Sequence, residues 1–231
     1  MNFGGLQLTT ALDYPGEIAT ILFTKGCNMK CSFCHNSSIA SGSGSNYRDK
    51  DIFNKLMERK NKIDHIVISG GEPTIYDYDL IRFMIRLKNS GFKIKLDTNG
   101  LRPDVIEQII RLNIADYIAM DIKTILIPSE YGRITGIKMS DSDLSNIIQS
   151  IHDITFSNIQ YEFRTTVIKT YHNMDILKKL AELKLPVHFL QKFVNSDRVP
   201  DHSLESYTDD EMREITQKLK TINPNIELRG V

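Results

Sequence analysis

Three kinds of feature are scarce in this chain, and each scarcity excludes a class of function. No stretch approaches the roughly 18 apolar residues of a membrane span, and no basic segment followed by an apolar run opens the chain. Lys plus Arg and Asp plus Glu number 29 each, so no net charge attracts a polyanion. We therefore expect a cytoplasmic protein whose main partner is neither a membrane nor a nucleic acid.

Cysteine is absent everywhere except in one short run. Cys27, Cys31 and Cys34 are the only three in 231 residues. An odd, clustered set gives no disulfide framework and indicates one metal site in a reducing compartment. A [4Fe–4S] cluster normally takes four thiolates, so a C-x3-C-x2-C run leaves one iron open to another ligand. The alternative is a structural zinc site that His35 completes, although His35 and its neighbour Cys34 would then have to reach one ion.

Six apolar, β-branched runs alternate with amphipathic segments along the chain. The expected strands are residues 18–23, 65–69, 93–97, 117–121, 161–167 and 186–190. The expected helices lie near residues 51–59, 78–89, 103–112, 142–154, 174–183 and 209–221. Strand followed by helix, six times over, predicts a parallel α/β sheet. Six strands are too few for a closed eight-stranded barrel, so we expect an open, partial (β/α)6 barrel that forms a single domain over residues 1–231.

Two segments interrupt this alternation. Residues 37–46 are rich in Gly and Ser and are expected to form a loop after the cysteine run. Residues 124–138 contain one Pro and two Gly and are also expected to form a long loop. Asp77, Asp141 and Asn173 precede expected helices and are candidate N-caps.

Polar motifs follow the C-terminal ends of the expected strands. In chain order they are Gly26–Cys34, Gly70-Gly71-Glu72-Pro73, Asp97-Thr98-Asn99-Gly100, Asp121-Ile122-Lys123, the pair Arg164 and Thr166, and Phe193. Parallel α/β proteins place their active sites at this edge of the sheet. The period of two places Asp97 with Asn99 on one strand face and Asp121 with Lys123 on another. Opposed charges in a cleft suit a zwitterionic ligand, whereas the alternative is a salt bridge at the sheet rim.

In this order the cysteine run, GGEP, DTNG and DIK resemble the radical S-adenosylmethionine (SAM) superfamily, in its glycyl-radical-enzyme activating branch. Four further segments are similar to the activating proteins of anaerobic ribonucleoside-triphosphate reductase. They are residues 5–16, Cys34-His35-Asn36, residues 164–167 and residues 190–193. The resemblance covers essentially the whole chain and implies the radical SAM type of partial barrel.

The resemblance also implies the cofactors and their contacts. Cys27, Cys31 and Cys34 would hold one [4Fe–4S] cluster, and SAM would bind its open iron. The implied SAM contacts are Phe33, His35, Gly70, Gly71, Glu72, Asp97, Asn99, Asp121, Lys123, Arg164, Thr166 and Phe193. Among these, Lys123 suits the SAM carboxylate, Asp97 its ammonium and Asp121 a ribose hydroxyl. Asp13 and Tyr14 match the region that receives a partner's glycine loop, with an ordinary Asp-Tyr-Pro-Gly turn as the alternative.

The implied reaction begins with a one-electron donor such as flavodoxin or ferredoxin. Reductive cleavage of SAM gives a 5′-deoxyadenosyl radical, which removes hydrogen from the Cα of a glycine in a glycyl radical enzyme. Anaerobic ribonucleotide reductase is the expected partner, and a pyruvate formate-lyase-like enzyme is an alternative. A small-molecule radical SAM enzyme and a structural metal-binding module also remain open. No side chain beyond the cluster and SAM is expected to be catalytic, because the cofactor carries the chemistry.

Overall fold

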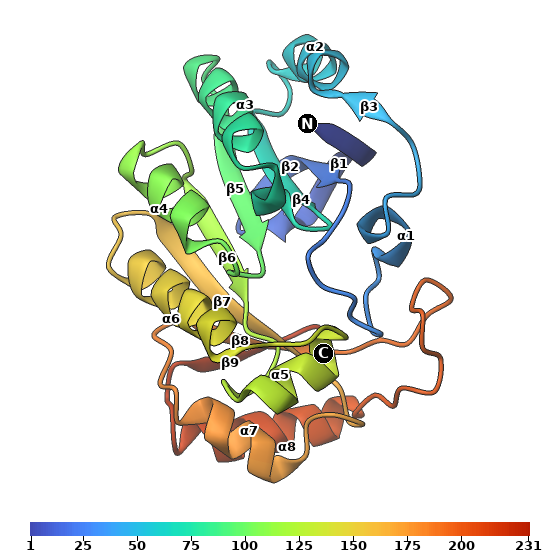
Figure 1. Ribbon diagram of the computed structural model, residues 1–231, viewed down its shortest axis with the longest axis vertical. Helices are drawn as coiled ribbons and strands as arrows, with labels where there is room; N and C mark the ends of the chain where they lie inside the picture. Colours follow the sequence, from blue (N-terminus) through green and yellow to red (C-terminus); the bar gives the residue numbers. More distant parts are fainter. The chain divides into compact units, whose positions relative to one another are not determined.

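The structure, a computed structural model, describes all 231 residues (Figure 1). The strands are β1 (Asn2–Tyr14), β2 (Glu17–Thr24), β3 (Tyr47–Arg48), β4 (His65–Gly70), β5 (Lys93–Thr98), β6 (Tyr117–Asp121), β7 (Gln160–Val167), β8 (His188–Lys192) and β9 (Ile226–Arg229). The helices are α1 (Ser37–Ala40), α2 (Asp49–Arg59), α3 (Tyr78–Asn89), α4 (Pro103–Arg111), α5 (Pro128–Thr135), α6 (Asp141–Thr155), α7 (Met174–Ala181) and α8 (Asp209–Lys220), with a 3₁₀ turn η1 (Pro73–Tyr76). All six expected strands and all six expected helices are confirmed.

The chain divides into two compact units. Unit 1 comprises Met1–Asn28, Asn36–Ala119 and Asn146–Gln160, and unit 2 comprises Met29–His35, Met120–Ser145 and Tyr161–Val231. The boundary falls inside β6 and inside α6, so each of these elements contributes to both units. Segment 37–46 belongs to unit 1, where it begins with the single helical turn α1 and then continues without regular structure.

Unit 1 is built on strands in the order β3-β1-β2-β4-β5. Strand β2 pairs in parallel with β4, and β4 with β5, whereas β1 is antiparallel to both β2 and β3. The central strands are buried on both faces, as near-continuous apolar runs predict. Helix α3 buries Leu80, Phe83, Met84 and Leu87, which recur at spacings of three and four. The expectation of an open, parallel α/β sheet is confirmed.

Unit 2 contains β7, β8 and β9, which pair in parallel. Strand β9 was not predicted. Helix α5 corrects the expectation of a long loop over residues 124–138. Its Pro128 occupies the first helical position and Gly136 ends it at φ +68°, so the residues that suggested a loop are the start and stop signals of a short helix.

The helix caps differ from expectation at two of three positions. Asn173 caps α7 as expected, because its side chain accepts a hydrogen bond from the Ile176 N–H. Asp77 makes no capping bond and instead pairs with Arg102. The side chain that bonds into the first turn of α6 belongs to Ser140, not Asp141. None of the helices combines the length and the apolar character that a membrane span requires.

Candidate active site

The three cysteines lie on the loop between β2 and α1. All three are free of disulfides and partly buried. Cysteine thiolates are the usual ligands of an iron–sulfur cluster, so the three side chains are of the chemical type that could hold one. Burial raises the pKa of the Cys31 thiol, and the positive charge of Lys123 in the same unit opposes that rise. The nearby cation therefore favours the thiolate form that a metal ligand requires.

The GGE segment packs directly on the start of the cysteine loop. Gly71 N–H donates to the Thr24 carbonyl at 2.9 Å, and Glu72 N–H donates to the Gly26 carbonyl at 2.9 Å. A Cβ added at Gly71 would lie 1.9 Å from the Gly26 oxygen, and one added at Gly70 would lie 2.3 Å from the Thr24 nitrogen. Both glycines are therefore needed so that this backbone can approach the loop. The sequence suggested a close approach to a ligand, and the structure shows one to the chain itself.

The Glu72 carboxylate holds two of the motifs together. Its Oε1 accepts from Thr74 N–H at 3.1 Å, Thr74 Oγ1 at 2.6 Å and Thr98 Oγ1 at 2.8 Å, and its Oε2 accepts from Asn99 N–H at 2.7 Å. Burial raises the pKa of this carboxyl, and the four hydrogen bonds oppose the rise. Asn99 then donates from Nδ2 to Asn28 Oδ1 at 2.7 Å. Glu72 is 1% exposed, so we assign it a holding role and not the ligand contact that the sequence suggested.

Asp97 faces a buried cation that the sequence analysis missed. Lys95 is 2% exposed and donates from Nζ to Asp97 Oδ1 at 2.8 Å. Its Nζ also lies 5.9 Å from the centroid of the Tyr117 ring. The sequence could have indicated this lysine, because Lys95 and Asp97 are two residues apart on β5 and therefore share one strand face.

Unit 2 brings together Asp121, Lys123 and Arg164, three of the residues that the resemblance implies as SAM contacts. Asp121 accepts from Lys123 Nζ and from Arg164 Nε, each at 2.8 Å. Burial alone would raise the pKa of Asp121, but the two cations outweigh it and hold the pKa well below its usual range. The pKa of Lys123 is raised because Asp121 outweighs its burial. All three groups therefore stay charged at neutral pH.

Two residues that sequence reasoning missed extend this group. Glu162 is fully buried and lies 3.9 Å from Arg164 Nη1, and it receives both terminal nitrogens of Arg229 at 2.9 and 2.8 Å. Glu162, Arg164 and Thr166 share one face of β7, so the period of two could have identified Glu162. Arg229 lies on β9, and no neighbouring sequence pattern indicates that it contacts Glu162.

The aromatic residues expected at the cofactor lie in or beside an apolar cluster of unit 2. Phe33 is 7% exposed and Phe193 is fully buried, and both pack with Ile168 and Val199. A stacking contact between Phe193 and adenine would require this ring to leave its cluster. The His35 ring lies 6.0 Å from that of Phe193, and its Nε2 is 2.8 Å from the Val194 carbonyl, to which it can only donate.

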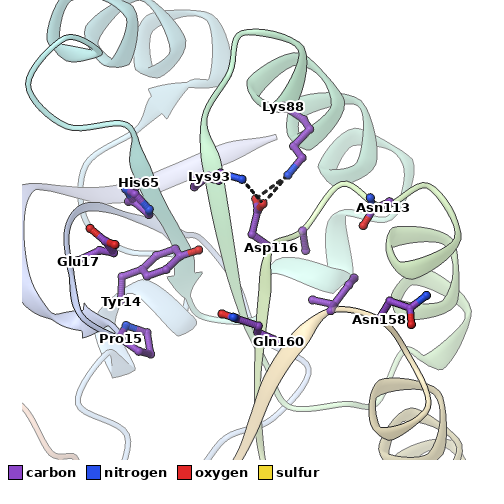
Figure 2. A pocket seen from close by; sticks show the side chains of 12 residues that line it. Tyr14, Pro15, Glu17, His65, Lys88, Lys93, Asn113, Asp116, Asn158 and Gln160 are labelled. Carbon is purple, nitrogen blue, oxygen red and sulfur yellow. Dashed lines mark hydrogen bonds and ion pairs between the residues drawn. The ribbon is translucent and has the colours of Figure 1, made fainter.

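Asp13 and Tyr14 lie at the wrong edge of unit 1 for the expected role. Tyr14 pairs with Glu17, the first residue of β2, whereas the cysteine loop follows Thr24, the last one. The eight residues of β2 separate these ends by roughly 23 Å at about 3.3 Å per residue. Tyr14 packs edge-on against His65 at 4.7 Å and lines a polar pocket of about 390 Å³ beside the strand starts (Figure 2). This placement argues against a contact between either residue and a glycine held near the cysteines.

These features define a parallel α/β protein with a three-thiol loop at the C-terminal edge of its strands. A sequence profile of the radical SAM superfamily matches residues 21–183. The chain belongs to this superfamily, whose members use a [4Fe–4S] cluster and SAM, and it is therefore a radical SAM enzyme.

Its relatives support the activating branch. A protein of Methanocaldococcus jannaschii named "Putative glycyl-radical enzyme activating enzyme" is 29% identical over 98% of this chain and 95% of its own length. A pyruvate formate-lyase-activating enzyme of Listeria monocytogenes is 28% identical over 87% of this chain and 82% of its own length. The structure of QueE from Escherichia coli aligns with a TM-score of 0.58 at 16% identity, over 100% of this chain and 94% of QueE. The last comparison supports the fold alone.

Proposed function

We propose that this chain is an activase that removes a hydrogen atom from the Cα of one glycine in a partner enzyme. The observation that carries this proposal is the nearly full-length similarity to a glycyl-radical enzyme activating enzyme. Segments 5–16, 164–167 and 190–193 favour anaerobic ribonucleoside-triphosphate reductase as the partner. We propose flavodoxin or ferredoxin as the electron donor.

Cys27, Cys31 and Cys34 would hold the cluster. When bound, the reduced cluster and SAM together supply a carbon-centred radical that can abstract hydrogen. The contribution of the chain is to hold SAM and the target in place, because hydrogen transfer requires reacting atoms within about 3–3.5 Å.

The charged group of unit 2 is suited to a zwitterionic ligand. Lys123 Nζ has three N–H donors and gives one to Asp121, so it can also bind a carboxylate. Within unit 2, we propose that Asp121 accepts a ribose hydroxyl and that Thr166 and His35 line the same ligand. Within unit 1, we propose that Asp97 binds an ammonium group. Glu72, Gly70, Gly71 and Asn99 would act indirectly, since they hold the backbone around the cysteine loop.

A second candidate partner is a pyruvate formate-lyase-like enzyme. It is favoured by the similarity to the Listeria activating enzyme over 87% of this chain. The two candidates share one chemistry and differ only in the protein that presents the glycine, so one experiment can decide between them.

The test mixes anaerobically reconstituted, reduced protein and SAM with each candidate partner and records the EPR spectrum. We expect the doublet of a glycyl radical with the reductase and 5′-deoxyadenosine in equal amount. Cys31→Ala should abolish both products. SAM cleavage without a protein radical on either partner would refute the activase and favour a small-molecule substrate. Full folding with stoichiometric zinc and no iron would favour a structural module.

A further inference from the structure

Strand β1 has an open outer edge. It is 13 residues long and pairs along its inner side with β2 from Phe3 to Tyr14. Along its outer side it pairs only with β3, a strand of two residues, at Asn2 and Phe3 (Figure 1). An edge strand presents backbone N–H and C=O groups that can pair with another extended chain.

A groove runs beside this edge, with helix α2 as its other wall. It has a volume of about 360 Å³ and is lined by Leu6, Leu8, Tyr47, Lys55, Glu58 and Arg59. Leu8 is 44% exposed, so part of this apolar side chain is open to a ligand in the groove. A strand edge facing a helix across a partly apolar groove is the arrangement by which peptide-binding domains accept an added strand.

Arg59 places a cationic side chain on this groove, with one donor that makes no hydrogen bond. Its Nη2 donates to the Leu8 carbonyl and to Thr9 Oγ1, both at 3.3 Å, near the long limit of a hydrogen bond. Its Nε is buried and has no hydrogen-bond partner. A buried donor without an acceptor destabilises the unbound protein. Lys55 adds a second cation and Glu58 one anion, so a carboxylate complements the groove.

We infer that the groove between β1 and α2 docks an extended segment of the activated partner enzyme, with an apolar side chain beside Leu6 and Leu8 and a carboxylate at Arg59. The inference rests on the proposed function. The start of β1 lies beside the cysteine loop. The N–H of Lys25, two residues before Cys27, donates to the Asn2 carbonyl at 3.1 Å. The outer edge at Asn2 and Phe3 is paired with β3, so a docked segment would pair with β1 beyond Phe3.

A second copy of this chain is a poorer occupant. Its own β1 contains one acid, Asp13, and antiparallel pairing centred on Leu8 would bring two Arg59 side chains together. Like charges at such a junction oppose association. Charge thus favours a partner of different sequence.

The test compares two groove variants with matched controls. Leu8→Asp and Arg59→Glu alter the groove. Leu112→Asp changes a side chain of equal exposure (45%) on another face of unit 1, and Lys50→Glu makes a similar charge change at the other end of α2, outside the groove. Binding of the reconstituted protein to the anaerobic reductase is measured by calorimetry, and SAM cleavage is measured without partner.

We expect each groove variant to bind the reductase at least tenfold more weakly and each control within twofold of the parent, with SAM cleavage unchanged in all four. Hydrogen exchange on the unaltered protein gives an independent readout, in which amides of residues 4–10 should become protected when the reductase binds.

Parent-like binding by both groove variants, or protection confined to other segments, would overturn the inference alone. Protection of residues 4–10 that grows with protein concentration and needs no reductase would also overturn it, in favour of a second copy. If the parent protein neither binds nor activates the reductase, the proposed partner is wrong and the inference falls with it.

Discussion

Replacement of Glu72 tests whether the GGEP segment holds the site or touches the ligand. Glu72→Ala leaves the N–H groups of Thr74 and Asn99 without their acceptor in a buried position. Each such group costs about 1–3 kcal/mol, so we expect the free energy of unfolding to fall by about 2–6 kcal/mol. Removal of a buried charge offsets part of this loss. Glu72→Gln keeps one acceptor oxygen but turns an N–H₂ toward one of the donors, so its loss should be smaller.

The assay is anaerobic urea unfolding together with iron analysis. Because Asn99 also reaches Asn28 beside Cys27, we expect Glu72→Ala to lose bound iron as well as stability. Glu107→Ala, at an exposed position on α4, is the control for loss of one acidic side chain. A Glu72→Ala protein with parental stability and iron but no response to SAM would refute the holding role and restore a direct ligand contact.

Three further outcomes are expected. Gly71→Ala should destabilise the fold and lower the iron content, measured as above, because its Cβ would lie 1.9 Å from the Gly26 oxygen. Lys123→Met should weaken SAM binding about tenfold or more, seen as a weaker SAM effect on the cluster EPR signal, and leave the iron content unchanged. Burial lowers the pKa of His188 from 6.5 to about 4. The neutral ring is therefore fully favourable to the fold above pH 6.5, and the free energy of unfolding falls by on the order of 3 kcal/mol as the pH drops from 6.5 toward 4. His188→Asn should remove this fall, measured as the urea midpoint against pH.

The sequence predicted those elements whose apolar pattern is simple. Strand β4 is a continuous buried run and needs no context to be recognised. Strand β1 was missed because it contains Gly4 and Gly5, alternates weakly, and shifts its register three times against β2. Helix α5 was missed because Pro128 and Gly136 were weighed as loop formers, although at helix ends they act as start and stop signals.

The sequence could predict contacts between site residues that lie on one strand, but not contacts between residues far apart in the chain. The period of two placed Lys123 beside Asp121, and their ion pair confirms it. No such rule could identify Arg229, because its partner Glu162 is 67 residues earlier in the chain. The orientation of the Glu72 carboxylate could not be predicted either, since a GGEP motif does not reveal whether the carboxylate faces a ligand or the next βα turn.

Among the candidate residues, those of unit 1 support the chain and those of unit 2 remain accessible, and this division predicts what their substitution should change. In unit 1, Glu72 and Asn99 are buried and bonded to neighbouring loops, so their substitution should act on stability and iron retention. In unit 2, the side chains of Asp121 and Lys123 are 31% and 15% exposed, and the pair leaves Lys123 with donors for a ligand. A ligand carboxylate can therefore bind without breaking the ion pair, and substitutions there should act on SAM affinity. If unit 1 variants instead changed affinity alone, the division would be wrong.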